Sequence, residues 1–188
     1  MIRGCDKLTG TRNIHTFVDM DSFWQREFRK RMDAFAHTDT NGMVPVSLKV
    51  RVASGCFHRE HSPQAYALID NYLNSADLSK LKCQFEEHES GPEILVYLAV
   101  TTAGLTFAKS ILDLITAIIK ARSEGIKKGD KPSDPLEIIV RGHSKGGVYF
   151  EETVLRIPSD HTVTARQIQD ALTKHKSPSQ PKRTRRKK

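Results

Sequence analysis

Apolar and polar residues alternate along two short stretches of the chain, and this pattern predicts two β-strands. Residues 46–53 alternate strictly, with Val46, Leu48, Val50 and Val52 as the apolar members. Residues 80–87 repeat the pattern with Leu81, Cys83 and Phe85. Because successive side chains of a strand point to opposite faces, each stretch predicts a strand with one buried face.

A helical pattern lies between these strands, and another precedes them. Ser62-Pro63 supplies an N-cap and a first-turn proline for a helix to about Asn74, whose apolar residues fall on one face. Strand, helix and strand in this order favour a right-handed parallel crossover. Upstream, residues 21–35 predict a short amphipathic helix with Trp24, Phe28 and Phe35 on one side.

The longest apolar run, residues 90–122, predicts the central helix. Ser90 and Glu93 have the spacing of a capping box, and small residues around Gly104 leave open whether one helix or two follow. Residues 94–108 are uncharged, so 94–119 is also a candidate membrane span. That uncharged stretch is shorter than the roughly 18–20 residues that a span needs, so we expect a buried helix instead.

Two strands and a helix complete the expected fold. Residues 136–142 and 148–158 have strand composition, and Thr164 and Gln167 repeat the capping-box spacing ahead of a last helix. The predicted class is α/β of the α+β kind: a small mixed β-sheet in the order β-α-β-α-β-β-α, with a long central helix and an N-terminal helical extension. We expect three regions: an extension (1–43), a single α/β domain (44–173) and a disordered basic tail (174–188).

The positive charge is concentrated in this tail. The chain has 188 residues, with 30 Lys and Arg against 22 Asp and Glu, and eight of the basic residues follow Thr173. The remaining 22 basic and 22 acidic side chains balance. We predict that the tail attracts a polyanion, a nucleic acid or an anionic surface, without reading sequence. The predicted contacts are Lys182, Arg183, Arg185, Arg186, Lys187 and Lys188.

The three cysteines are scattered, which favours reduced thiols and a cytoplasmic protein. Cys56, His58 and His61, with Cys83 and His88 further on, have side chains suited to zinc. The C-x-H-x-x-H spacing is not that of a standard pair of ligand knuckles, and Cys83 falls on an apolar strand face. We therefore predict no metal site and no cofactor. The N-terminus lacks a secretory pattern, and Met1, Met20 and Met43 are all possible starts.

Gly142-His143-Ser144-Lys145-Gly146 matches the G-x-S-x-G pattern of a hydrolase nucleophile elbow. An elbow must lead into a helix, whereas the next residues favour a strand. Asp160 and His161 are adjacent, so they do not easily serve as facing acid and base, and His175 lies in the basic stretch. We interpret Ser144 as a turn residue of a β-hairpin and predict no catalytic residue; a serine hydrolase using Ser144 remains the enzymatic alternative.

The element order resembles the effector-associated constant component domains of bacterial conflict systems. The similarity covers about residues 46–172 and rests on four features: the element order, the Pro92-Glu93 helix start, the small residues around Gly104, and a hairpin followed by a last helix. The resemblance implies a non-enzymatic adaptor that couples an effector to its trigger through a protein partner. Besides the hydrolase, the alternatives are a single-span membrane protein through 94–119 and a nucleic-acid-associated protein acting through its tail.

Overall fold

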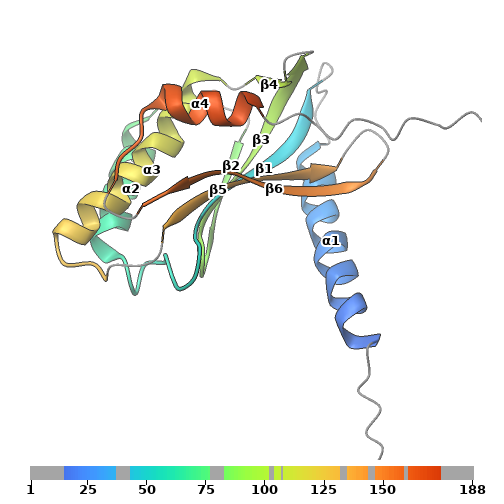
Figure 1. Cartoon of the computed structure of the whole chain (residues 1–188), viewed down its shortest axis with the longest axis horizontal. Helices are drawn as coiled ribbons and strands as arrows, with labels where there is room; N and C mark the ends of the chain where they lie inside the picture. The colour runs from blue at the N-terminus through green and yellow to red at the C-terminus, as the bar shows by residue number, and fades with distance from the viewer. Residues whose placement is uncertain are drawn as a thin grey trace, which may run out of the picture.

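A computed structural model describes residues 15–36, 43–76, 83–101, 104–106, 108–131, 135–143, 147–158 and 161–174. The chain order of the elements is α1 (His15–Ala36), β1 (Val44–Val52), α2 (Pro63–Ser75), β2 (Cys83–His88), β3 (Gly91–Thr101), β4 (Gly104–Thr106), α3 (Lys109–Lys127), β5 (Leu136–His143), β6 (Tyr149–Ile157) and α4 (Ala165–Lys174). Figure 1 shows these elements as one sheet with helices on both sides.

Five strands form the sheet in the order β2-β3-β1-β5-β6, and the short β4 pairs with the end of β3. The α+β class predicted from the sequence is confirmed. The sheet is antiparallel rather than mixed, since every pairing between the described strands is antiparallel. β1 and β2 do run in the same direction, but β3 lies between them. The predicted crossover therefore connects strands that are not neighbours.

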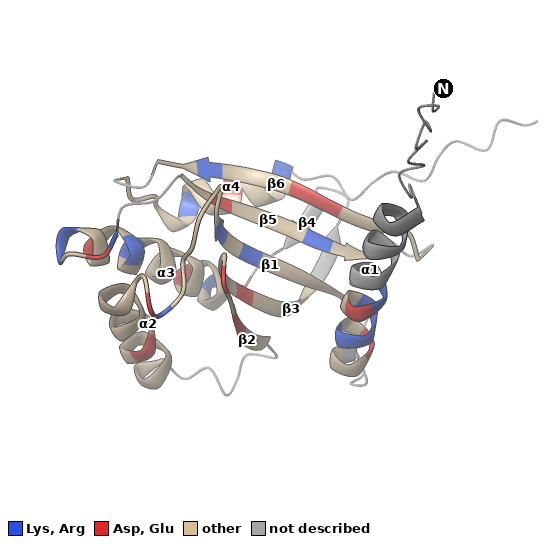
Figure 2. Cartoon of the chain, turned by 90° about the horizontal axis from the view of Figure 1, so that it is seen from below, with Lys and Arg blue, Asp and Glu red and all other residues tan. Residues whose placement is uncertain are grey.

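Three helices cover one face of the sheet and one helix crosses the other. α2, α3 and α4 lie together over one face, where their apolar sides meet the inward residues of the strands (Figure 1). The core residues predicted on β1 are all buried there. α1 crosses one end of the opposite face, where Phe28 and Met32 pack on Leu95 of β3. Figure 2, seen toward this face, shows that no other helix of the described residues crosses the rest of it.

The predicted helix over 90–122 is wrong in its first half, which forms β3 and β4. β3 is the second strand from the β2 edge and is buried on both faces. Ile94, Val96 and Leu98 belong to the core under α2 and α3, whereas Leu95 and Tyr97 meet α1. A strand covered on both faces is a continuous apolar run, so it has no alternation to distinguish it from a buried helix.

The helical half begins at Lys109, where α3 starts. Residues 94–119 therefore run through two strands and part of a helix, and the membrane-span alternative is not supported. Of the helices in the described ranges, none has the length and apolar character to cross a membrane.

The other predicted elements are present with small shifts. α1 begins at His15, six residues before the predicted start. α2 buries Ala65 and Ile69 as expected, and α4 buries Ile168 and Leu172. The second capping box also forms: the Thr164 backbone N–H donates to Gln167 Oε1 at 2.9 Å, and the Gln167 N–H donates to Thr164 Oγ1 at 3.3 Å.

α2 receives its N-terminal cap from a distant residue. Ser62 occupies the N-cap position, but its hydroxyl makes no capping hydrogen bond. The buried carboxylate of Asp130, on the loop after α3, instead accepts the N–H groups of Gln64 at 3.1 Å and Ala65 at 3.0 Å. This contact fixes the start of α2 against the end of α3, and it satisfies two N–H groups that a helix leaves unpaired.

Candidate functional site

The G-x-S-x-G stretch begins in the last two residues of β5 and continues toward β6. Residues 144–146, Ser144 among them, fall outside the described residues, but the two flanking strands are clear. His143 at the end of β5 pairs with Tyr149 at the start of β6 in an antiparallel register. The predicted hairpin is thus confirmed, and the motif leads into a strand. The strand–turn–helix context of a nucleophile elbow is not formed by the described residues on either side.

Of the three candidate partners of Ser144, His161 is the one that lies in the described part of the chain. Asp160 and His175 lie outside the described part of the chain. His161 sits just before α4, where its backbone N–H donates to Pro158 O at 3.0 Å. His143, inside the motif, packs against the rings of Phe28 and Tyr149, which also contact each other. Burial and the nearby Arg29 lower the pKa of His143, which favours its neutral form.

β6 forms one edge of the sheet and is the most open strand of the hairpin. Among the described strands it pairs with β5 alone. Four of its nine residues are exposed: Glu151, Glu152, Thr153 and Arg156. The opposite edge strand, β2, is shorter, with six residues. An edge strand has a side with no neighbouring strand, and another extended segment can add to that side through backbone hydrogen bonds.

Between the two edges, the sheet face under α1 carries a network of charged side chains. Its centre is Glu93 on β3, whose side chain is fully buried. Arg141 of β5 approaches it through Nη2 and donates from Nε at 3.1 Å, and Ser47 of β1 donates a short hydrogen bond. From β2, His88 Nε2 lies 2.8 Å from Glu93 Oε2. From α1, Arg31 Nη1 lies 3.5 Å away.

These contacts make Glu93 an ionised carboxylate inside the protein. Burial alone would raise its pKa, because desolvation disfavours the charged form. The contacts with His88, Arg141 and Ser47 act in the opposite direction and hold the pKa of Glu93 well below its usual range. Arg31 also pairs with Glu86 of β2 at 2.7 Å, so the network joins α1 to β2 and β3.

The network continues across the uncovered part of the face toward β6. Arg51 of β1 lies 3.3 Å from Glu137 of β5 and 4.0 Å from Glu151 of β6. Burial and the neighbouring Arg141 lower the pKa of Lys49. Figure 2 shows basic and acidic positions together on the strands of this face. The polar surface of this face thus extends to the β6 edge, where Glu151 and Arg156 lie beside Arg51 and Glu137.

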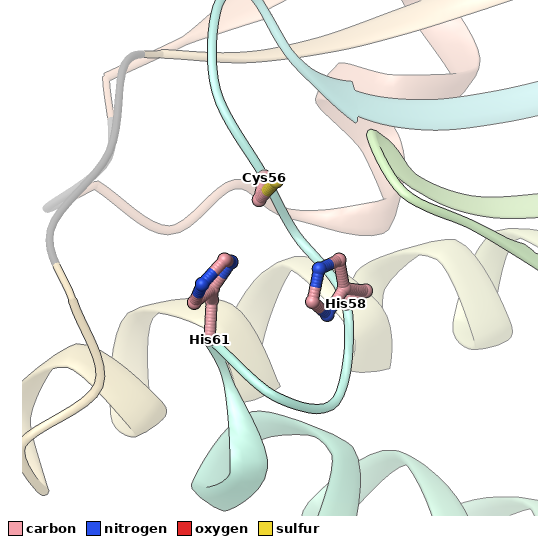
Figure 3. Close-up of side chains that lie close together, drawn as sticks. All are labelled: Cys56, His58 and His61. Carbon is pink, nitrogen blue, oxygen red and sulfur yellow. The ribbon is translucent and has the colours of Figure 1, made fainter.

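The metal-ligand candidates divide into two groups. Cys56, His58 and His61 come together on the loop between β1 and α2, with one ligand atom from each lying within 4.8 Å of the others (Figure 3). His88 belongs instead to the Glu93 network, where it lies close to two carboxylates. Cys83 packs at the margin of the core. The predicted polyanion contacts of the tail, residues 182–188, lie outside the described residues.

Sequence reasoning missed the Glu93 network because it placed Glu93 in the first turn of a helix. The available signal was polar complementarity in neighbouring strands: the oppositely charged Lys49 and Glu93 are register partners, and Arg141 is the register partner of the polar Ser47. Pairs of this kind are recognisable only when the strand order is known.

Comparisons with known proteins add no family or fold assignment. No family model, curated protein or solved structure matches this chain. One feature behind the resemblance drawn from the sequence, the helix start at Pro92-Glu93, is a strand in the structure. Another feature, the hairpin followed by a last helix, is present as β5, β6 and α4.

Proposed function

We propose that this protein is a non-enzymatic interaction module that binds an extended segment of a partner protein along β6. The observation that carries this proposal is the open edge of the sheet: β6 is nine residues long, pairs with β5 alone among the described strands, and exposes its middle. In the role that the sequence resemblance implies, the partner is an effector or the switch that triggers it, in the cytoplasm of a bacterium.

The charges of the edge indicate the chemistry of the segment. Glu151 and Glu152 are adjacent and exposed at the middle of β6, one on each face of the sheet. A strand added beside them meets a carboxylate on either face, and opposite charges on neighbouring strands stabilise their pairing. We therefore propose a partner segment with Lys or Arg near its centre. Backbone hydrogen bonds supply the affinity, and the acidic pair supplies the preference.

Two proline variants test the edge, and each is the control for the other. In an antiparallel strand, adjacent residues point their N–H groups alternately toward the paired and the free side. Glu151→Pro and Glu152→Pro therefore remove one donor from the β5 ladder and one from the open edge. The ladder variant is the one with the lower midpoint of thermal unfolding, because proline is tolerated only where the N–H is unpaired.

The assay is recovery of partner proteins on the immobilised full-length chain from extracts of the native host, with nuclease added. We expect a discrete protein that the parent retains and the edge variant, although folded, releases. Amide hydrogen exchange of the recovered complex should then slow along β6. A partner retained equally by the folded edge variant would overturn the proposal.

Removing the basic tail distinguishes the nucleic-acid alternative from binding along β6. A chain ending at Thr173 keeps the whole of β6 and loses the basic residues that follow. If all recovered material disappears with nuclease or with the tail, the protein is a tail-driven polyanion binder and the interaction-module proposal fails. The hydrolase alternative predicts labelling by a fluorophosphonate that Ser144→Ala abolishes.

A further inference from the structure

We propose that Cys56, His58 and His61 form a zinc-binding site on the loop between β1 and α2. Their ligand atoms all lie within 4.8 Å of one another, and Figure 3 shows the thiol and the two imidazole rings converging on one space. All three side chains are partly exposed, so an ion can reach them from solvent. The site is separate from the β6 edge and does not depend on the proposed interaction.

The residue between the first two ligands anchors the loop. The Phe57 side chain is fully buried, its N–H donates to Glu89 O at 2.9 Å, and its carbonyl accepts the Tyr66 hydroxyl at 2.9 Å. Because Phe57 points into the core, Cys56 and His58 on either side of it are held at the surface. The fold therefore positions the first two ligands before any ion binds, which reduces the entropy that binding must overcome.

A tight turn positions the third ligand. The carbonyl of His58 accepts the N–H of His61 at 3.2 Å and that of Ser62 at 2.8 Å, immediately before α2 begins. The turn brings the two imidazole rings to a centroid distance of 4.6 Å. In a tetrahedral zinc site with bonds of about 2.0–2.3 Å, ligand atoms lie about 3.4–3.6 Å apart. Small side-chain rotations are enough to close the three ligands around an ion.

The donor set selects the metal. One thiolate and two imidazoles suit zinc, whereas magnesium and calcium prefer oxygen ligands. On binding, the Cys56 thiol releases its proton to solvent and the thiolate coordinates the ion. Three protein ligands leave a fourth position for water. Glu89 lies beside the thiol, with its Oε1 accepting from Cys56 Sγ at 3.6 Å, and a carboxylate next to the cluster favours a cation there.

His58 gives the site a spectroscopic signature. The Glu60 backbone N–H donates to His58 Nδ1 at 3.1 Å, so without metal the neutral ring carries its proton on Nε2. Coordination through Nε2 moves this proton to Nδ1 and releases the Glu60 N–H, which is exposed and can donate to water. Nitrogen NMR of the imidazole should therefore show a change of tautomer when zinc binds.

The test is titration of the full-length, reduced chain with Zn²⁺ alone, followed by Co²⁺ as a visible probe. We expect one equivalent to bind and the cobalt form to show thiolate charge-transfer bands. Loss of a residue that only orients a ligand typically lowers metal affinity about 10–100-fold, and loss of a ligand itself should lower it more. Cys56→Ser, His58→Ala and His61→Ala should therefore each weaken zinc binding by about a hundredfold or more. Cys83→Ser is the matched control and should bind like the parent.

A second measurement needs no variant. Iodoacetamide alkylation followed by mass spectrometry reports each cysteine separately, and zinc should slow the modification of Cys56 while leaving Cys83 unchanged. Binding that is not saturable would overturn the proposal. So would cobalt bands that survive Cys56→Ser, or unprotected alkylation of Cys56 at saturating zinc, because the ion would then lie elsewhere.

Discussion

Replacing Glu93 with alanine tests whether the buried charge network holds the sheet together. The substitution removes the carboxylate that Arg141 faces across β1, and the Arg141 side chain is itself only 17% exposed. Removing one partner of a buried ion pair costs about 3–5 kcal/mol, because the remaining charge stays desolvated. This is a large part of the roughly 5–15 kcal/mol by which domains are stable. We expect the free energy of unfolding to fall by about that 3–5 kcal/mol.

The assay is urea unfolding at neutral pH, with the slope checked against the parent so that a shift in midpoint reports stability. Glu124→Ala is the matched control: this carboxylate pairs with Lys127 at 2.9 Å at the surface, and we expect only a small loss, because exposed ion pairs contribute little to stability. In the double variant Glu93→Ala/Arg141→Ala, the loss should be smaller than the sum of the single losses, because the two residues share one interaction. A loss for Glu93→Ala no larger than that for Glu124→Ala would refute the reasoning.

Further predictions concern pH, capping and a tight turn. The pKa of Glu93 in the folded protein lies below its ordinary value of 4.5, so the folded state binds fewer protons than the unfolded state. The free energy of unfolding should therefore fall as the pH drops below about 5. Urea titrations of Glu93→Gln should show a weaker fall over this acidic range. Asp130→Ala should lower the free energy of unfolding by about 1–2 kcal/mol, because it removes the cap of α2. Asp130→Asn keeps an acceptor oxygen, so it should lower this free energy by less. Equal losses for the two variants would contradict the capping role. Gly91 has φ +137°, and a Cβ there would lie 2.2 Å from Val50 O, so Gly91→Ala should lower the free energy of unfolding by about 3 kcal/mol or more. Gly55 has φ +109° but open space around it, so Gly55→Ala should lower that free energy by only about 1–2 kcal/mol. Thermal unfolding of this pair checks the ranking.

The elements predicted correctly from the sequence are those whose local pattern carries the signal. β1 alternates because its two faces differ: Leu48 lies in the main core, whereas Ser47 lies beneath the charge network. α2 and α4 have apolar residues at helical spacing, and the Thr164–Gln167 box marks the start of α4 within one turn. Such signals come from neighbouring residues, so they do not depend on the rest of the fold.

The error over residues 90–101 has a physical cause in the tertiary structure. β3 is apolar on both faces because α1 covers one and the α2–α3 layer covers the other. Capping-box spacing at Ser90 and Glu93 then favoured a helix, yet Glu93 is buried in the middle of the sheet among basic groups. What covers a strand is decided by elements distant in sequence, and residue patterns within the strand do not record it.

For the candidate sites too, some features can be read from the local sequence and others depend on tertiary packing. The hairpin after β5, the α+β class, the concentration of basic residues after Thr173 and the presence of zinc-type ligands near position 58 follow from the residues alone. Which of those ligands meet depends on how the chain folds. The tertiary structure separated His88 and Cys83 from the Cys56 cluster, gave α2 its cap from Asp130, and left β6 as a sheet edge. The reason is that composition and period are local properties, whereas a binding site is made where segments far apart in the chain are packed side by side.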